Sequence, residues 1–340
     1  MVTITDSQTA LATEQLAKTA RAAEQAGDFD RALGFFRGLC EVEPANPVWA
    51  FDAVRVLNKS GRAAEAAEAL RQAMRKWPDA SRRPEIRAIL PVVAPSEEQH
   101  RTALGADCPP DEALKRPLIK DDASEDFIVG LGGRKAAVLV FTGLADRIVM
   151  PLPLFDRYLA ELDLTAIYLR DRKRIGFFNG VKSLADDYDG TIAKLKEVLG
   201  AAGVENVHTL GNSAGGIGAV SYGIDLGART ALGFSAPVSI TRQAADLDRR
   251  TAVFAERLLG DVPPERRDLR QRLMEREGAT AVHLYYGSEM PEDLYHASTL
   301  DGVPGVTLHP LPGLGGHGAL FRMAETGGLR NLFRETYGAA

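Results

Sequence analysis

The spacing of hydrophobic and polar positions changes once along the chain. From about residue 7 to 90, apolar side chains recur at helical spacing among many Ala, Leu, Glu, Gln and Arg residues, which predicts helices. Beyond about residue 126, short apolar runs alternate with amphipathic stretches, which predicts a mostly parallel sheet covered by helices on both faces. Residues 91–125 contain five prolines and mixed charges, as is typical of a linker or wrapping segment. We therefore expect an all-α domain at 1–92, a linking segment at 93–125 and an α/β domain at 126–340.

The α/β part divides further into expected elements. Its apolar runs predict strands at 136–142, 164–169, 206–210, 230–235, 281–286 and 305–309. Its clearest amphipathic stretches predict helices at 183–202, 214–226 and 318–336.

A 34-residue period runs through the helical part. The matched positions are Gly27 and Gly61, Ala32 and Ala66, Phe36 and Leu70, Cys40 and Met74, and Pro44 and Pro78. In such a unit Gly breaks the first helix, a small Ala lets the paired helices approach, and Pro ends the repeat. The segment resembles two tetratricopeptide repeats, at 11–44 and 45–78, with a generic array of helical hairpins as the alternative. Because about three repeats are needed for independent stability, we expect these two to stack on helices near 84–103 or on the following domain.

Composition and charge narrow the class of protein. The chain is 45% hydrophobic, and 41 basic against 46 acidic residues leave no positive excess for binding nucleic acid. Cys40 and Cys108 are far apart and lack His at metal-ligand spacing, so we predict neither a disulfide framework nor a zinc site. The N-terminal residues lack a signal-peptide pattern, and no run of about 18 apolar residues occurs. We expect a cytoplasmic protein with no membrane span, metal or cofactor.

The run Gly211-Asn-Ser213-Ala-Gly215-Gly216 carries the most specific chemical signal. It fits the pattern G-x-S-x-G, follows the apolar run 207–210 and precedes a helix of small residues. At such a sharp turn, side chains in place of the glycines would collide with the neighbouring strand and helix. The Ser213 hydroxyl would project above the sheet at a helix N-terminus, whose free N–H groups stabilise negative charge. A glycine-rich helix start that packs on a strand or holds a phosphate is the alternative.

This elbow and its context resemble the α/β-hydrolase superfamily over roughly residues 126–340, with the lipase and esterase branches nearest. The resemblance implies the order nucleophile, acid, histidine along the chain. His317 fits the histidine best, because it lies in a glycine-rich run after the last predicted strand and before the last predicted helix. His296 is the rival. His208, His283 and His309 fall within or at the ends of predicted strands and are interpreted as packing or face residues.

The acid should follow the penultimate strand, where it would orient the imidazole. Many hydrolases place it three residues after a glycine, but here that position is Met290. We favour Asp293, with Glu289 next, because a short Asp is the usual choice in the family and Asp293 precedes the start of a helix.

The resemblance also implies an oxyanion hole, a possible lid and a substrate edge. One oxyanion donor is the amide of Ala214, and the second comes from Leu144 or Gly143 in a loop that lacks the His-Gly-Gly-Gly motif. Residues 238–279 predict a lid or a pair of surface helices. The basic and aromatic residues at 170–179 predict recognition of an anionic or carbohydrate-bearing substrate, or a solvated charge run with aromatic anchors.

These features favour a serine hydrolase that cleaves a carboxylic ester, with catalytic residues Ser213, His317 and Asp293. The alternatives are an acyltransferase acting on a glycan or metabolite alcohol, and an inactive interaction protein. The expected partners are a small-molecule or glycan ester and a peptide or protein bound by the helical repeats.

Overall fold

The computed structural model of the chain separates into two compact units, Met1–His100 and Arg101–Ala340. The residues that it describes are 6–60, 62–77, 80, 86, 101, 104–122, 124–144, 146–248, 255, 260, 262–276 and 278–338. Gly61 and Pro78 of the proposed repeat, most of the helices expected near 84–103, and residues 249–254 of the expected lid lie outside this part.

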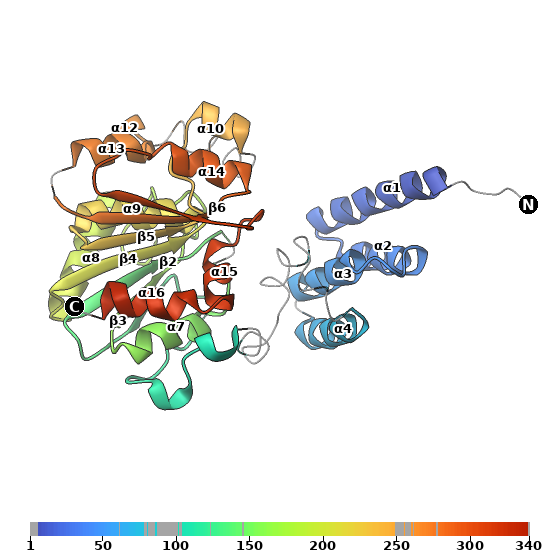
Figure 1. Cartoon of the computed structure of the whole chain (residues 1–340), viewed down its shortest axis with the longest axis horizontal. Helices are drawn as coiled ribbons and strands as arrows, with labels where there is room; N and C mark the ends of the chain where they lie inside the picture. The colour runs from blue at the N-terminus through green and yellow to red at the C-terminus, as the bar shows by residue number, and fades with distance from the viewer. Residues whose placement is uncertain are drawn as a thin grey trace, which may run out of the picture. The chain divides into compact units, whose positions relative to one another are not determined.

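The first unit is helical throughout its described elements. The helices are α1 (Asp6–Gln25), α2 (Phe29–Val42), α3 (Val48–Lys59) and α4 (Ala63–Lys76), and each packs against the next along the chain (Figure 1). The chain breaks between α1 and α2 at Gly27, whose φ of +78° favours glycine. Ala32, Phe36, Ala66 and Leu70 are buried in one core between the helices.

The second unit is built on a seven-stranded sheet in the order β1-β3-β2-β4-β5-β6-β7. The strands are β1 (Phe127–Gly130), β2 (Ala136–Phe141), β3 (Thr165–Leu169), β4 (Asn206–Asn212), β5 (Thr230–Phe234), β6 (Ala281–Gly287) and β7 (Val306–Leu311). Among these seven strands, only β1 runs antiparallel to its neighbour, and the other neighbouring pairs are parallel. The predicted mostly parallel sheet is therefore confirmed. β1 was not among the predicted strands, because its four half-buried residues form no extended apolar run.

Helices cover both faces of this sheet (Figure 1). The face formed by Val138, Val140 and Tyr168 packs against α7 (Leu152–Glu161), α15 (Ala319–Glu325) and α16 (Gly328–Tyr337). The opposite face, which includes Leu139 and Ile167, packs against α8 (Tyr188–Ala201) and α9 (Ala214–Leu226). The single helix predicted at 318–336 is two helices separated by a turn at 326–327.

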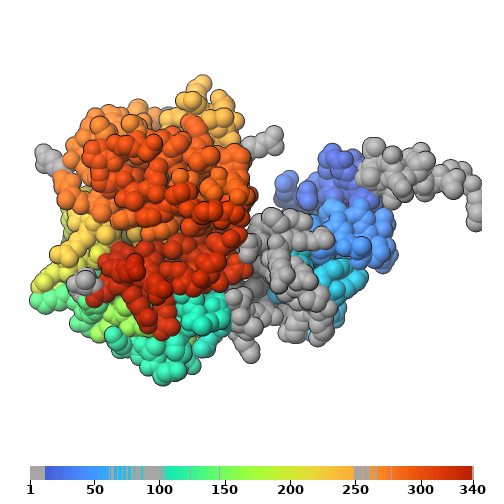
Figure 2. Space-filling view, in the orientation of Figure 1, coloured from blue at the N-terminus to red at the C-terminus, as the bar shows by residue number. Residues whose placement is uncertain are grey.

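A segment that precedes the sheet is attached to its outer helices. Two short 3₁₀ turns, Gly105–Asp107 and Asp111–Ala113, lie in this segment, and the first contacts α15 and α16 (Figure 2). Arg116 forms two hydrogen bonds of 2.6 and 2.7 Å with the fully buried carboxylate of Asp156 on α7. Because burying either charge alone would be strongly unfavourable, this pair fixes the segment against α7.

The stretch between β5 and β6 carries three further helices in its described residues, α10 (Arg242–Leu247), α12 (Pro264–Arg267) and α13 (Leu269–Glu275). On α13, Arg272 donates to both carboxylate oxygens of Asp225 on α9 at 2.7 Å. One more helix, α14 (Pro291–Ser298), follows β6. In the described part of the chain, none of the helices combines the length and apolar character needed to cross a bilayer.

Candidate active site

Ser213 lies on a sharp turn between β4 and α9. Its φ of +54° and ψ of −129° place it in a backbone region that side chains rarely occupy, and such strain concentrates at functional sites. A Cβ added to Gly211 would overlap the backbone of Gly215, and one added to Gly215 would overlap the carbonyl oxygens of Phe141 and Thr142. The glycines are therefore required by the close approach of strand and helix, for the reason inferred from the motif.

A continuous chain of hydrogen bonds joins Ser213, His317 and Asp293. The Ser213 Oγ and His317 Nε2 atoms are 2.7 Å apart, and His317 Nδ1 is 2.9 Å from Asp293 Oδ1. His317 lies in the loop between β7 and α15, and Asp293 lies in the first turn of α14. The Asp293 side chain is 1% exposed, whereas that of His317 is 25% exposed, so the carboxylate is enclosed while the imidazole faces an accessible site. The structure thus brings together the three residues singled out in the sequence.

The rival residues have other partners. Glu289 accepts a hydrogen bond of 3.0 Å from the amide of Gly313, so it supports the loop that leads to His317. His296 is buried one helical turn after Asp293, and its Nε2 lies 3.3 Å from Asp248 Oδ2. Each side chain is thus paired with a residue other than Ser213.

The strand histidines are held within or against the sheet. His208 on β4 bonds Thr230 at 2.7 Å, and burial lowers its pKa to about 4. His283 and His309, on the adjacent strands β6 and β7, lie 3.1 Å apart, and burial lowers the pKa of both imidazoles. These three residues are therefore packing or face residues, as interpreted from their positions.

The start of α9 and the loop after β2 both lie beside Ser213. Ala214 begins α9, so its N–H belongs to the positive end of the helix dipole. On the other side, a Cβ built on Gly143 would lie 3.6 Å from the Cβ of Ser213, which puts the loop after β2 beside the serine. The amide of Gly143 already donates to the carbonyl of Arg147 at 2.9 Å. Of the two candidates in this loop, Leu144 is therefore the one whose amide is not used in that turn.

The basic and aromatic residues after β3 are largely engaged by the protein itself. Arg170 is 3% exposed, and its guanidinium donates to groups of residues 121–125 and 146. Lys173 donates to the carbonyls of Asn179 and Asp186, both at 3.0 Å. Phe177 and Phe178 are buried. These contacts argue against direct recognition of substrate by Arg170 and Lys173, and the burial of Arg170 also departs from the alternative of a solvated charge run.

Ser235, a residue that the sequence did not single out, supports the loop after His317. It follows β5 with a φ of +46° and is 1% exposed. Its amide donates to Tyr285 at 2.8 Å, and its Oγ accepts a hydrogen bond of 3.4 Å from the amide of Ala319, two residues after His317. In the sequence, Ser235 could have been found from its place at the end of a predicted strand, because ligands bind at the carboxyl edge of the sheet in open α/β folds.

The arrangement as a whole can generate a nucleophile. The Ser213 hydroxyl is hydrogen-bonded to the imidazole of His317, whose second nitrogen is hydrogen-bonded to a carboxylate. A hydroxyl in this arrangement can lose its proton as it attacks a carbonyl. In the described residues, no cluster of three or more His, Cys, Asp or Glu side chains is arranged to hold a metal ion.

Comparison with known proteins gives a likeness in structure only. Neither a family model nor a curated protein matches the sequence. Among solved structures, esterase B from Lactobacillus rhamnosis, inhibited by a tributyrin phosphonate, is 13% identical with a TM-score of 0.50, and the match covers 72% of this chain and 92% of that one. An α/β-hydrolase enzyme from a metagenome of lagoon sediments is 16% identical with a TM-score of 0.41, covering 66% and 99%. An esterase from Pyrobaculum calidifontis is 14% identical with a TM-score of 0.45, covering 72% and 91%.

The likeness to esterase B and the mostly parallel sheet flanked by helices establish the α/β-hydrolase fold for the second unit. The expectation drawn from the Ser213 elbow is thereby confirmed at the level of the fold.

Proposed function

We propose that the protein is a serine hydrolase that cleaves a carboxylic ester, with Ser213 as nucleophile, His317 as general base and Asp293 as the acid that orients it. The observation that carries this proposal is the hydrogen-bond chain from Ser213 Oγ through His317 to Asp293, with distances of 2.7 and 2.9 Å. The strained turn that presents the serine at the start of α9 supports it further.

In the proposed reaction, Ser213 Oγ attacks the ester carbonyl while His317 Nε2 takes the hydroxyl proton. The carbonyl oxygen becomes an oxyanion, which accepts hydrogen bonds from the amides of Ala214 and Leu144. His317 then gives its proton to the departing alcohol as the carbon–oxygen bond breaks, which leaves an acyl-serine. Water attacks the acyl-serine, again with His317 taking the proton, and the acid is released as Ser213 regains its hydrogen. Throughout, Asp293 stabilises the protonated imidazole.

The name of the similar structure adds support for this chemistry. Esterase B from Lactobacillus rhamnosis is described as inhibited by a tributyrin phosphonate. Phosphonates react with activated serine hydroxyls, so a phosphonate probe is a suitable test of Ser213.

The proposal is tested by treating the full-length protein with a labelled fluorophosphonate and by measuring hydrolysis of short-chain nitrophenyl esters. We expect labelling and turnover in the wild type and loss of both in Ser213→Ala. An unlabelled wild type, or labelling that persists in Ser213→Ala, would refute the proposal and leave a non-enzymatic role. A large acceleration of acyl-enzyme breakdown by a sugar or other alcohol would instead indicate acyl transfer.

We also propose that the first unit comprises two tetratricopeptide-like repeats, at 11–44 and 45–78, which bind a peptide or protein partner. In the wider domain plan, 1–92 is the repeat domain, 93–125 the linking or wrapping segment and 126–340 the catalytic domain. Consecutive packing of α1 to α4 and the burial of Ala32 and Ala66 support the repeat assignment.

A further inference from the structure

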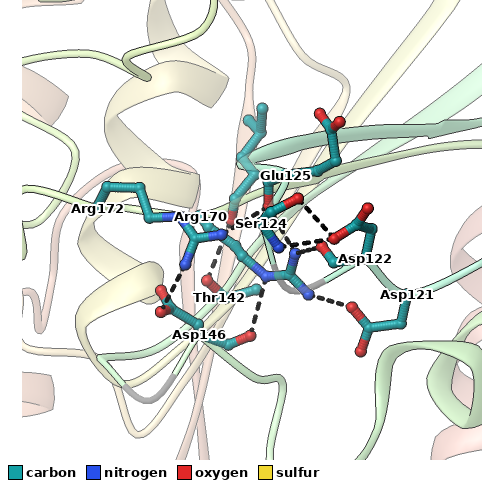
Figure 3. Close-up of polar contacts among 9 residues, drawn as sticks. Asp121, Asp122, Ser124, Glu125, Thr142, Asp146, Arg170 and Arg172 are labelled. Carbon is teal, nitrogen blue, oxygen red and sulfur yellow. Dashed lines mark hydrogen bonds and ion pairs between the residues drawn. The ribbon is translucent and has the colours of Figure 1, made fainter.

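Arg170 and Arg172, which follow β3, both form hydrogen bonds with Asp146 in the loop that follows β2 (Figure 3). The side chain of Arg170 is 4% exposed, and its Nε donates to the carbonyl of Asp146 at 3.3 Å. Arg172 reaches the same residue from its other side, since Nη1 lies 3.1 Å from Asp146 Oδ2. One residue of the loop is thus held by both its backbone and its carboxylate.

The same arginines are anchored to the segment before β1. Arg170 Nη1 donates to the carbonyls of Asp122 and Glu125 at 2.6 Å each, and Nη2 pairs with the Asp121 carboxylate (Figure 3). Arg172 Nη2 donates to the carbonyl of Glu125 at 2.9 Å. A guanidinium has five N–H donors. Arg170 uses one of them on Asp146 and three on the segment before β1. Arg170 is therefore committed to the protein and is not presented to a ligand.

The loop after β2, which Arg170 and Arg172 hold through Asp146, is the loop that lies beside Ser213. Its turn is closed by two backbone hydrogen bonds, from Gly143 N to Arg147 O at 2.9 Å and from Asp146 N to Gly143 O at 3.0 Å. Leu144 lies inside this turn. Asp146 has a φ of +56°, a left-handed conformation that Asp tolerates better than most residues but that must still be held in place by its surroundings.

We propose that Arg170 and Arg172 are positioning residues, which hold the turn through Asp146 so that the amide of Leu144 stays within reach of the oxyanion formed at Ser213. This inference rests on the proposed ester hydrolysis. It assigns Arg170 and Arg172 to transition-state stabilisation and not to binding of an anionic substrate. A donor that is already in place when charge develops needs no reorganisation during the reaction, which is why a rigid anchor raises the rate.

The decisive variants are Asp146→Asn and Arg172→Gln. Asn tolerates the left-handed backbone as well as Asp does, so the first substitution removes the charge without adding backbone strain. Lys173→Gln is the matched control, since it removes a positive charge from the same basic run, and the hydrogen bonds of Lys173 to described residues go to the carbonyls of Asn179 and Asp186. Loss of an entire oxyanion donor lowers kcat by about 10²–10³-fold, and loosening one costs less. We therefore expect kcat to fall about tenfold in each decisive variant, with KM within about twofold of the wild type.

A second readout separates positioning from general destabilisation. A trifluoromethyl ketone forms a tetrahedral adduct with the serine, whereas the matching methyl ketone binds without forming an oxyanion. Affinity for the fluorinated ketone should fall in parallel with kcat/KM in Asp146→Asn and Arg172→Gln, while affinity for the methyl ketone stays constant. Arg172→Lys should recover part of the loss. The double variant should be no worse than Arg172→Gln alone, because Asp146→Asn weakens an ion pair that Arg172→Gln already removes.

The outcomes distinguish this inference from the function on which it rests. If wild-type Ser213 is not labelled by the fluorophosphonate, the proposed function fails, and this inference fails with it. If the wild type is labelled and active but both variants keep its kcat and its affinity for the fluorinated ketone, only the positioning role is refuted. An equal rise in KM for anionic esters in Arg172→Gln and Lys173→Gln would instead assign the basic run to substrate binding.

Discussion

Gly215→Ala provides a demanding test of the geometry at the elbow. The added Cβ would lie 2.6 Å from the carbonyl oxygen of Thr142 and closer still to that of Phe141, although real Cβ atoms essentially never approach within 3.0 Å. The obstacles are backbone atoms at the end of β2, which cannot rotate away as a flexible side chain could. The start of α9 and the end of β2 must therefore separate by about 1 Å, a displacement that can cost about 10² in rate when it misplaces reacting groups.

The separation acts on both sides of the site at once. The start of α9 carries Ser213 and the amide of Ala214, while the end of β2 leads directly into the loop that contains Leu144. We expect kcat for a nitrophenyl ester to fall about 100-fold. Overpacking of this kind also costs about 1–3 kcal/mol of stability, and each kcal/mol lowers Tm by about 2–4 °C in a domain of this size.

The matched control is Gly200→Ala, near the end of α8, where an added Cβ meets nothing within 4 Å. Replacing an exposed helical Gly by Ala stabilises a protein by about 0.5–1 kcal/mol, so Tm should rise slightly and kcat should not change. Initial rates, thermal unfolding and the rate of fluorophosphonate labelling would be compared for the two variants. A Gly215→Ala protein with wild-type Tm and a kcat within twofold of the wild type would refute the steric reasoning.

Three further predictions concern the acid, a buried histidine and the repeats. Asp293→Asn should lower kcat by about 10⁴-fold. Glu289→Gln weakens only a loop contact and should keep kcat within a few-fold of the wild type. If steady-state kinetics gave the reverse ranking of the two variants, the acid would be reassigned to Glu289. Burial lowers the pKa of His208 to about 4, below the unfolded value of about 6.5, so the unfolded chain binds more protons between these limits. The free energy of unfolding should therefore fall as the pH drops from about 6.5 to about 4, by on the order of 1–2 kcal/mol at pH 5, and His208→Gln should reduce this slope in urea titrations. Ala32→Leu and Ala66→Leu, at matched positions of the proposed repeat, should each destabilise the helical unit by about 1–3 kcal/mol, and a neutral effect at either one in thermal unfolding would argue against the repeat.

The sequence was most informative where function depends on neighbours along the chain. A strand, the Gly-x-Ser-x-Gly pattern and a helix of small residues all lie within about twenty residues, so the elbow could be predicted from residues that are close together in the sequence. The prediction of His317 rests on the glycine-rich loop around it and on the chain order that the α/β-hydrolase resemblance implies. The sequence alone does not choose between Asp293 and Glu289, because both follow β6 and the conformation of that loop decides which carboxylate meets the imidazole.

Features that depend on distant partners could not be predicted in this way. Helix α7 was not among the predicted helices, and it buries the charged residues Asp156, Arg157 and Glu161. Those charges are tolerated because each is paired: Asp156 with Arg116, Arg157 with Asp111, and Glu161 with two arginines of α16. A pattern of hydrophobic and polar positions treats such residues as exposed, since it contains no information about pairs formed across the fold.

The order of the strands explains why the site forms between β2 and β4. After β2 the chain forms β3, which pairs with one edge of β2. It later forms β4, which pairs with the other edge of β2. The connections therefore diverge at this pair of strands, and open α/β sheets bind ligands in the crevice that such a divergence leaves at their carboxyl ends. Ser213 follows β4 and the loop with Leu144 follows β2, so the proposed nucleophile and the proposed oxyanion donor come from the two sides of the divergence. His317 and Asp293 reach the same edge from the loops after β7 and β6. The hydrogen bond from Arg170 to Asp146 follows from this topology. Strand β3 is the other neighbour of β2, so the residue that follows β3 lies beside the loop that follows β2.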